Sequence, residues 1–300
     1  MAVGSGEFKY ERLDGWGELP PGFTFAPYLW TPLDMATDSQ DRVYVFSTGN
    51  HPLIILDREG KFITCWGEGH FKTPHGIYIG SDDSLYLVDC QAHKVEKYTL
   101  DGRLLMTLDS GREFWPAQGT QKGLPFNLPT NATVTPSGEI VVSDGYGNSR
   151  VHRFSADGEL INSWGEYGNG PGQFRLPHGV DTDKDGNVYV IDREPNHRIQ
   201  VFSPEGSYIT EWKTGLDFPK DLHIDRENGI LYLVEGEARA DIPRVSIRHL
   251  TGEIITEWRG RESRGEGLLE DPHGICVDTH GDIYISENQP VPRMVKFVKV

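Results

Sequence analysis

Three histidines occur in the same short motif, and their chemistry is that of metal ligands. His75, His178 and His273 each follow a proline and precede a glycine, at widely separated places in the chain. Three neutral imidazoles with a fourth position left open form a typical catalytic zinc site, with zinc–nitrogen distances of about 2.0–2.1 Å. Alternatively, Pro-His-Gly recurs only because the chain repeats itself, and the histidine has no ligand role. The choice depends on the elements that carry the motif.

The motif opens a longer repeat. Each copy continues with an apolar strand, Asp-x-x-Gly, a strand ending in Asp or Glu, a basic residue with a third strand, Asp-Gly, and a fourth strand ending near tryptophan. The copies begin at six prolines: Pro32, Pro74, Pro129, Pro177, Pro219 and Pro272. Four short strands per copy, with no amphipathic helix between them, are typical of a propeller blade. We therefore predict an all-β, six-bladed β-propeller of four-stranded blades, as a single domain over residues 1–300.

The last repeat lacks its fourth strand. It stops after its third strand at Val300, whereas Phe8 to Trp16 matches the fourth-strand signature of the other blades. We expect this N-terminal segment to pair with the strand containing Met294 to Val298. The N-terminal strand would thus complete blade six and close the ring, which removes exposed sheet edges.

The histidines alternate along the repeats. The residues after the six opening prolines are Leu33, His75, Thr130, His178, Lys220 and His273. In a propeller the first strand of each blade lines the central channel, so histidines on blades two, four and six would converge on the axis. Simple copying of a repeat would not produce this alternation, and the metal interpretation is favoured.

Two further residues lie in loops expected on the same face. Tyr146 and Arg193 follow second strands, whose ends share the face on which the first strands begin. A tyrosine beside a metal loses its proton more easily than its ordinary pKa of about 10 suggests. An arginine offers a planar fork for a carboxylate. Each alone is a weak signal, because loop arginines are mostly solvated.

Composition narrows the partners. The formal net charge of −16 argues against binding nucleic acid or an anionic membrane surface, both of which require clustered cations. No apolar run approaches the roughly 20 residues of a membrane span, and the N-terminus lacks an apolar signal core. The three cysteines are single and widely spaced, which fits a reducing compartment. We expect a cytoplasmic protein that acts on a small molecule; its oligomeric state stays open.

The longest motifs resemble one family. FNLPTNATVTPSGEIVVSDGYGNSRVHRFSADGELINSWGE, GPGQFRLPHGV and DREPNHRIQVF are similar to the NHL-type propeller of peptidylglycine α-amidating lyase. The resemblance implies that His75, His178 and His273 bind catalytic zinc, that Tyr146 of SDGY acts as the base, and that Arg193 of DRE helps to hold the substrate. It also implies cleavage of the C–N bond of a peptidyl-α-hydroxyglycine, which yields an amide and glyoxylate.

The sequence departs from the family pattern at three places. Thr48 stands where the family has a catalytic arginine, although His51 persists, and we expect both to lie near the substrate with Arg193. The family's structural calcium uses an Asp directly after the third zinc histidine, where this chain has Gly274. Asp34, in the adjacent blade, could restore that carboxylate and bind a second metal, calcium. The family's disulfide cysteines are also absent.

Three functions therefore stay open. The leading hypothesis is a zinc-dependent lyase that acts on an α-hydroxy amide bearing a carboxylate. The second is a zinc-dependent hydrolase, lactonase or hydratase, in which a zinc-activated water is the nucleophile. The third is a non-enzymatic NHL propeller that presents a face to a partner, although a scaffold has no need of three axial imidazoles.

Overall fold

The computed structural model describes residues 2–25, 33–109, 126–212, 218–236, 243–260, 269–288 and 292–300. The first repeat-opening proline, Pro32, lies outside these residues. Within them the chain forms strands and no helix, so no helix there could cross a membrane. The strands make six antiparallel sheets, five with four strands and one with five. The prediction of an all-β propeller with six blades is confirmed.

The chain divides into two compact units. Unit 1 comprises Met1–Pro74, Lys220–Asp225 and Ile230–Val300, and unit 2 comprises His75–Pro219 and Arg226–Gly229. Three sheets belong to each unit, and each unit is described by itself below. The expectation of a single domain over the whole chain stays a prediction.

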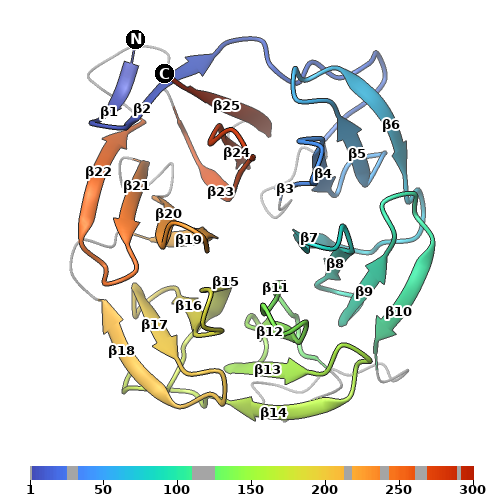
Figure 1. Cartoon of the computed structure of the whole chain (residues 1–300). Helices are drawn as coiled ribbons and strands as arrows, with labels where there is room; N and C mark the ends of the chain where they lie inside the picture. The colour runs from blue at the N-terminus through green and yellow to red at the C-terminus, as the bar shows by residue number, and fades with distance from the viewer. Residues whose placement is uncertain are drawn as a thin grey trace. The chain divides into compact units, whose positions relative to one another are not determined.

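Unit 2 holds the second, third and fourth repeats. Each forms one sheet whose strands pair in sequence order (Figure 1). The strands are β7 (Pro74–Ile79), β8 (Leu85–Asp89), β9 (Lys94–Tyr98), β10 (Leu104–Leu108), β11 (Asn131–Val134), β12 (Ile140–Asp144), β13 (Arg150–Phe154), β14 (Leu160–Trp164), β15 (Pro177–Thr182), β16 (Val188–Asp192), β17 (Arg198–Phe202) and β18 (Tyr208–Trp212).

Unit 1 holds the first, fifth and sixth repeats, again with one sheet for each repeat. The strands of the first and fifth repeats are β3 (Leu33–Thr37), β4 (Val43–Ser47), β5 (Leu53–Leu56), β6 (Phe62–Trp66), β19 (Pro219–Asp225), β20 (Ile230–Glu235), β21 (Arg244–His249) and β22 (Ile254–Arg259). The sixth sheet has the order β1 (Ala2–Ser5), β2 (Phe8–Leu13), β25 (Arg293–Lys299), β24 (Ile283–Glu287) and β23 (Pro272–Val277).

The place of a strand in its blade decides its burial. The second strands β8, β12 and β16 are buried along their whole length, whereas the residues of the fourth strands β10, β14 and β18 are mostly exposed or half-buried. In unit 2 one core cluster joins the third and fourth repeats: Val141, Val151, Phe174, Val180, Val188, Val190 and Phe202. These apolar side chains fill the space between the third and fourth sheets. Polar residues such as His75 and His178 lie instead at the beginnings of the first strands.

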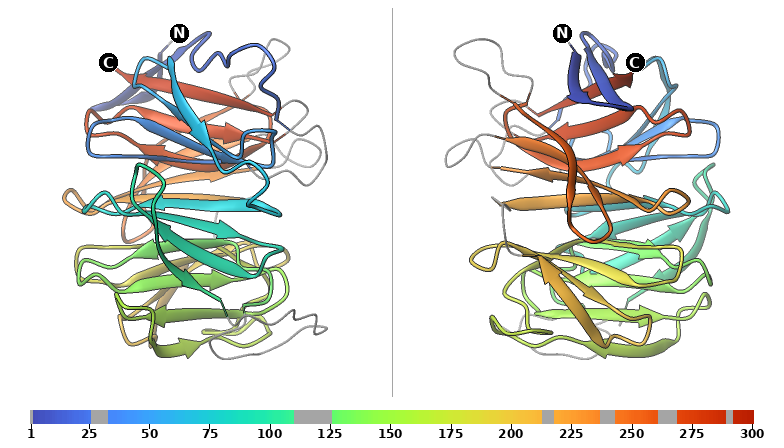
Figure 2. Two further views of the ribbon diagram at one scale, coloured as in Figure 1. Left: turned by 90° about the vertical axis from the view of Figure 1, so that its right-hand side faces the viewer. Right: turned by 60° about the vertical axis from the view of Figure 1, so that its left-hand side comes forward.

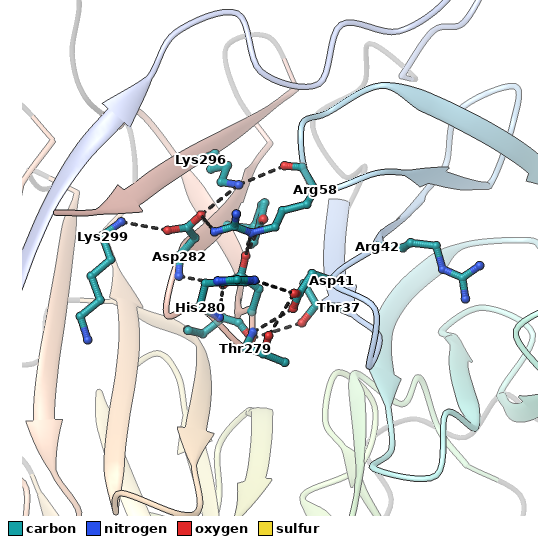
Figure 3. Close-up of polar contacts among 12 residues, drawn as sticks. Thr37, Asp41, Arg42, Arg58, Thr279, His280, Asp282, Lys296 and Lys299 are labelled. Carbon is teal, nitrogen blue, oxygen red and sulfur yellow. Dashed lines mark hydrogen bonds and ion pairs between the residues drawn. The ribbon is translucent and has the colours of Figure 1, made fainter.

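Polar contacts also join sheets within unit 1. The guanidinium of Arg58, after β5, contacts the buried Asp278 Oδ2 at 2.9 Å and Asp282 Oδ2 at 2.5 Å in the turn before β24. Lys296 of β25 lies 3.0 Å from the same Asp282 oxygen, as Figure 3 shows. Buried carboxylates are costly unless they are paired. This cluster therefore specifies how the first and sixth sheets meet at the face of the Asp-x-x-Gly turns.

The N-terminal strand completes the sixth blade as predicted. β2 pairs with β25, with Tyr10 opposite Lys299 and Leu13 opposite Lys296. The structure adds a fifth strand, β1, which pairs with β2, so that both chain ends lie in this blade (Figure 2). The sequence did not indicate β1, because this short segment with Gly4 has no apolar alternation. It pairs because β2 otherwise leaves an unpaired edge.

Deleting residues 1–18 should destabilise the protein strongly. The deletion removes β1 and β2 and with them the buried Phe8 and Tyr10, whose rings belong to the core of unit 1. Loss of one buried aromatic side chain typically costs about 3–5 kcal/mol. Thermal unfolding should show a markedly lower Tm, while Leu13→Ala, at a side chain that is 44% exposed, should change it little. An unchanged Tm in the truncated protein would contradict the role of this strand.

Candidate metal and catalytic site

Two of the three predicted histidines begin first strands in unit 2. His75 is the second residue of β7 and His178 is the second residue of β15, each directly after the opening proline. Proline fits the first position of a strand because it has no N–H to donate to the ladder. Both imidazoles are buried. The repeat thus places the same residue type at the same edge of two sheets.

The two imidazoles converge on the hydroxyl of Tyr146. The Nε2 atom of His75 lies 3.0 Å from Tyr146 Oη, and the Nε2 atom of His178 lies 3.1 Å from it. The two imidazole centroids are 5.0 Å apart. Two nitrogens on different sheets therefore aim at one point, as the ligands of a single metal ion must.

The His75 ring is oriented by the backbone of the next blade. Its Nδ1 atom lies 2.7 Å from the carbonyl oxygen of Thr130. A carbonyl can only accept, so Nδ1 carries the proton and Nε2 presents its lone pair. Metal-ligating histidines typically use such a second partner. Burial, with a smaller contribution from the charge of Arg193, lowers the pKa of His75 to about 4, so the ring is neutral near pH 7, as metal binding requires.

Tyr146 lies in an environment that opposes its ionisation, except for one neighbour. Burial raises the pKa of Tyr146 to about 12, while the charge of Arg193 and a hydrogen bond with it act in the opposite direction. The side chain of Arg193 is only 13% exposed and also contacts Glu194 at 3.1 Å. A base needs its unprotonated form, so Arg193 is the described residue that favours the phenolate most.

Acidic residues at the ends of two second strands form hydrogen bonds that position the loops carrying Tyr146 and Arg193. Asp144 of β12 accepts hydrogen bonds from the Asn127 amide at 2.8 Å and the Asn148 side chain at 2.8 Å. Asp192 of β16 accepts from the Leu176 amide at 3.0 Å and Arg198 Nε at 3.0 Å. These bonds tie the loops after β12 and β16 to the segments before β11 and β15. The sequence showed these acidic strand ends as part of the repeat, but not their positioning role.

Several known proteins are similar to this chain in sequence. The family model described as "NHL repeat" matches residues 126–154 and 174–202. Peptidyl-alpha-hydroxyglycine alpha-amidating lyase 1 of Drosophila melanogaster is 36% identical over 110 residues, or 36% of this chain and 19% of the relative. Peptidylglycine alpha-amidating monooxygenase of Rattus norvegicus is 29% identical over 203 residues, or 57% of this chain and 20% of the relative. The resemblance to the amidating lyases is confirmed. The chain spans about a fifth of the length of both relatives.

Solved structures share the fold. Virginiamycin B lyase from Staphylococcus aureus has a TM-score of 0.60 at 17% identity, with 90% of this chain and 86% of that chain covered. A gluconolactonase from Xanthomonas campestris has a TM-score of 0.64 at 14% identity, with 92% and 88% covered. At such identities the likeness concerns the fold alone. The chain is thus a six-bladed propeller that carries NHL repeats at residues 126–154 and 174–202 and is similar to the amidating lyases in sequence.

The remaining predicted residues belong to unit 1. His273 is the second residue of β23, buried and preceded by Pro272, as its counterparts in unit 2 are. Thr48 lies after β4, and its buried hydroxyl has no hydrogen-bond partner among the described residues. His51, in the same loop, lies 2.7 Å from Glu68 through its Nδ1 atom. Within unit 2 the structure thus brings His75, His178, Tyr146 and Arg193 together, while His273, Thr48 and His51 belong to unit 1.

The Asp34 carboxylate packs against Gly274 within unit 1. A Cβ atom built on Gly274 would lie 2.0 Å from Asp34 Oδ1, so a side chain at this position would require Asp34 to move. The buried Asp34 carboxylate therefore lies where a side chain at position 274 would begin. This packing is compatible with the suggestion from the sequence that Asp34 supplies the carboxylate that position 274 lacks.

Sequence reasoning missed two participants near Tyr146. The Thr130 carbonyl orients His75 and leaves no signal in the sequence, because every residue has a carbonyl. Cys90, buried after β8, is one of the groups that raise the pKa of Tyr146. Its place beside a candidate base follows only from the packing of two blades.

Proposed function

We propose that this protein is a zinc-dependent lyase that cleaves an α-hydroxy amide, such as an N-acyl-α-hydroxyglycine, into an amide and an aldehyde acid such as glyoxylate. One observation carries the proposal: the Tyr146 hydroxyl lies within 3.1 Å of the Nε2 atoms of His75 and His178 and beside Arg193. A candidate base, two metal ligands and an anion-binding group are thereby adjacent.

The donor set fits zinc. His75 and His178 supply imidazole nitrogens, and the tautomer of His75 leaves Nε2 free to bind a cation. We propose that His273, the third member of the alternating set, completes a three-histidine site. When bound there, zinc would supply a Lewis acid that lowers the pKa of the substrate hydroxyl.

The residues of the chain then account for the proton transfers. Tyr146, as a phenolate supported by Arg193, removes the proton of the substrate α-hydroxyl. The carbon–oxygen bond becomes a carbonyl, and the carbon–nitrogen bond breaks with its electron pair going to nitrogen. Tyr146 returns the proton to that nitrogen, which leaves as the amide. No water is consumed, so this reaction is an elimination rather than a hydrolysis.

Arg193→Ala should raise the KM for substrates that carry a carboxylate. The guanidinium can form a fork with the carboxylate of a hydroxyglycine, and this interaction exists before the reaction. Steady-state kinetics on α-hydroxyhippurate and on a neutral carbinolamide would show the effect, with KM rising at least about tenfold only for the acid. Equal changes for both substrates would contradict a carboxylate-binding role. Because Arg193 also contacts Tyr146, a smaller fall in kcat is expected for both substrates.

We also propose that Thr48 and His51 contribute to substrate binding and that Asp34 binds a structural calcium ion. The buried Thr48 hydroxyl without a described partner supports the first role. The Asp34 carboxylate beside Gly274 supports the second, because carboxylate oxygens are preferred calcium ligands.

A glyoxylate assay with α-hydroxyhippurate tests the lyase. Release of glyoxylate together with benzamide, in equal amounts, is the expected result. A hydrolase, lactonase or hydratase is the second candidate, favoured by Thr48 at the position of the family's arginine. Turnover of a lactone or ester without any glyoxylate would establish that second candidate. Absence of turnover in a metal-loaded protein, with a partner captured on its face, would favour the interaction propeller.

A further inference from the structure

A second group of metal-ligating side chains lies in unit 1, on the sheet of the first repeat. It consists of His51, Cys65 and Glu68, whose donor atoms all lie within 4.8 Å of one another. We propose that these residues form a zinc site, here named the Cys65 site. His51 is also a proposed substrate contact, but Cys65 and Glu68 have no role in the proposed lyase chemistry, so tests on these two residues separate the two proposals.

The strand register explains why these residues meet. On the antiparallel pair β5–β6, Leu53 is opposite Trp66 and Ile54 is opposite Cys65. If this register is continued past the strand ends, residue 52 comes opposite residue 67. The next pair is then His51 and Glu68. Loop 48–51 and the segment after β6 are therefore brought together by the hairpin itself.

The distances suit a tetrahedral ion. Cys65 Sγ lies 3.6 Å from His51 Nδ1 and 3.7 Å from Glu68 Oε1. With zinc–sulfur bonds of about 2.3 Å and zinc–nitrogen or zinc–oxygen bonds of about 2.0–2.2 Å, tetrahedral donors lie about 3.4–3.7 Å apart. The His51 to Glu68 separation is 2.7 Å, a hydrogen bond that a small rotation of the exposed glutamate would open.

The same geometry argues against a catalytic cysteine. In a Cys-His-acid triad the thiol and the acid contact opposite nitrogens of the imidazole, so that the ring can relay a proton. Here Cys65 and Glu68 both face Nδ1 of His51. Three donors that converge on one point are instead typical of metal ligands.

The surroundings hold the ligands while leaving an entry path. Phe23 stacks on the His51 ring at a centroid distance of 4.0 Å, and Phe62 packs edge-on against Phe23. Gly67 has a φ of +98°, which lets the chain turn so that Glu68 folds back toward Cys65. The side chains of His51 and Glu68 are 27% and 50% exposed, so an ion can enter from solvent.

The ligand types select the metal. A thiolate favours zinc over calcium or magnesium, and imidazole and carboxylate complete a mixed set with one open position for water. Binding would release the thiol proton of Cys65. It would also fasten loop 48–51, which carries Thr48, to the end of β6.

Cobalt titration tests the Cys65 site specifically, because the three-histidine site contains no sulfur. The full-length reduced protein, stripped of metal by a chelator, is titrated with Co²⁺ without oxygen. We expect a near-ultraviolet thiolate-to-cobalt absorption band in the wild type and in His178→Ala, and no band in Cys65→Ser. Glu68→Gln should keep the band with a Kd at least about tenfold higher. A wild type without the band, or a band that persists in Cys65→Ser, would overturn the proposal.

A second measurement uses the wild-type chain alone. Zinc should slow alkylation of Cys65 by iodoacetamide at least about tenfold, measured by peptide mass spectrometry, because a coordinated thiolate is shielded. Cys90 and Cys276 are buried and serve as internal references in the same sample. Equal alkylation rates with and without zinc would exclude Cys65 as a ligand even if the serine variant failed to fold.

Discussion

Tyr146→Phe should lower turnover of an N-acyl-α-hydroxyglycine by about 10²–10⁴-fold, the usual cost of losing a general base. The substitution keeps the ring and removes only the hydroxyl that lies 3.0 Å from His75 and 3.1 Å from His178. In the zinc-loaded protein the two nitrogens would have the ion as partner, so zinc content and Tm should stay near their wild-type values. Steady-state glyoxylate release gives the first measurement, and elemental analysis gives the second.

Tyr167→Phe is the matched control for that experiment. Tyr167 lies in the same unit, is 47% exposed and packs under the guanidinium of Arg175 rather than against a histidine. Its hydroxyl should be dispensable for turnover. If Tyr146→Phe were as active as this control on every substrate that the protein converts, the base would have to be another group.

His178→Ala should abolish zinc binding at the three-histidine site and with it the activity. A ligand truncated to alanine leaves at most two imidazoles, and the ion would be held far more weakly. The measurement belongs in a Cys65→Ser background, so that zinc at the Cys65 site does not contribute. We expect about one zinc per chain in that background and almost none after His178→Ala.

The control for the histidine series is His249→Ala, at an exposed position on β21. It should keep the zinc content of its parent. The triple alanine variant of His75, His178 and His273, again in the Cys65→Ser background, is the strictest test of the ligand assignment. Stoichiometric zinc in that protein would mean that these histidines are not the ligands.

Much of the fold was predictable because the repeat is explicit. The prolines, the Asp-x-x-Gly turns and the acidic strand ends recur with each blade, so strand order within a sheet followed directly. The pairing of β2 with β25 was predictable because Phe8 to Leu13 carries the fourth-strand pattern. The strand β1 was not, since its pairing depends on an open edge and not on side-chain pattern.

The Cys65 site shows a different limit of sequence reasoning. His51 belongs to one loop and Glu68 to the segment after the next hairpin, and this spacing matches no common ligand motif. Only the pairing of β5 with β6 brings the segments that carry them close together. His51 was therefore interpreted as a substrate contact, a role that stays a prediction.

The sequence by itself determined the residue types of the histidine site and their order along the blades, because those depend on a repeat that can be read from spacing. It also indicated Tyr146 and Arg193 through short motifs. The tertiary structure decided what these residues face. Two imidazoles share one hydroxyl, the Thr130 carbonyl sets the tautomer of His75, and burial lowers the pKa of His75 to about 4. Protonation and hydrogen-bond direction depend on the groups that surround a side chain, and packing between blades brings those groups from distant parts of the chain.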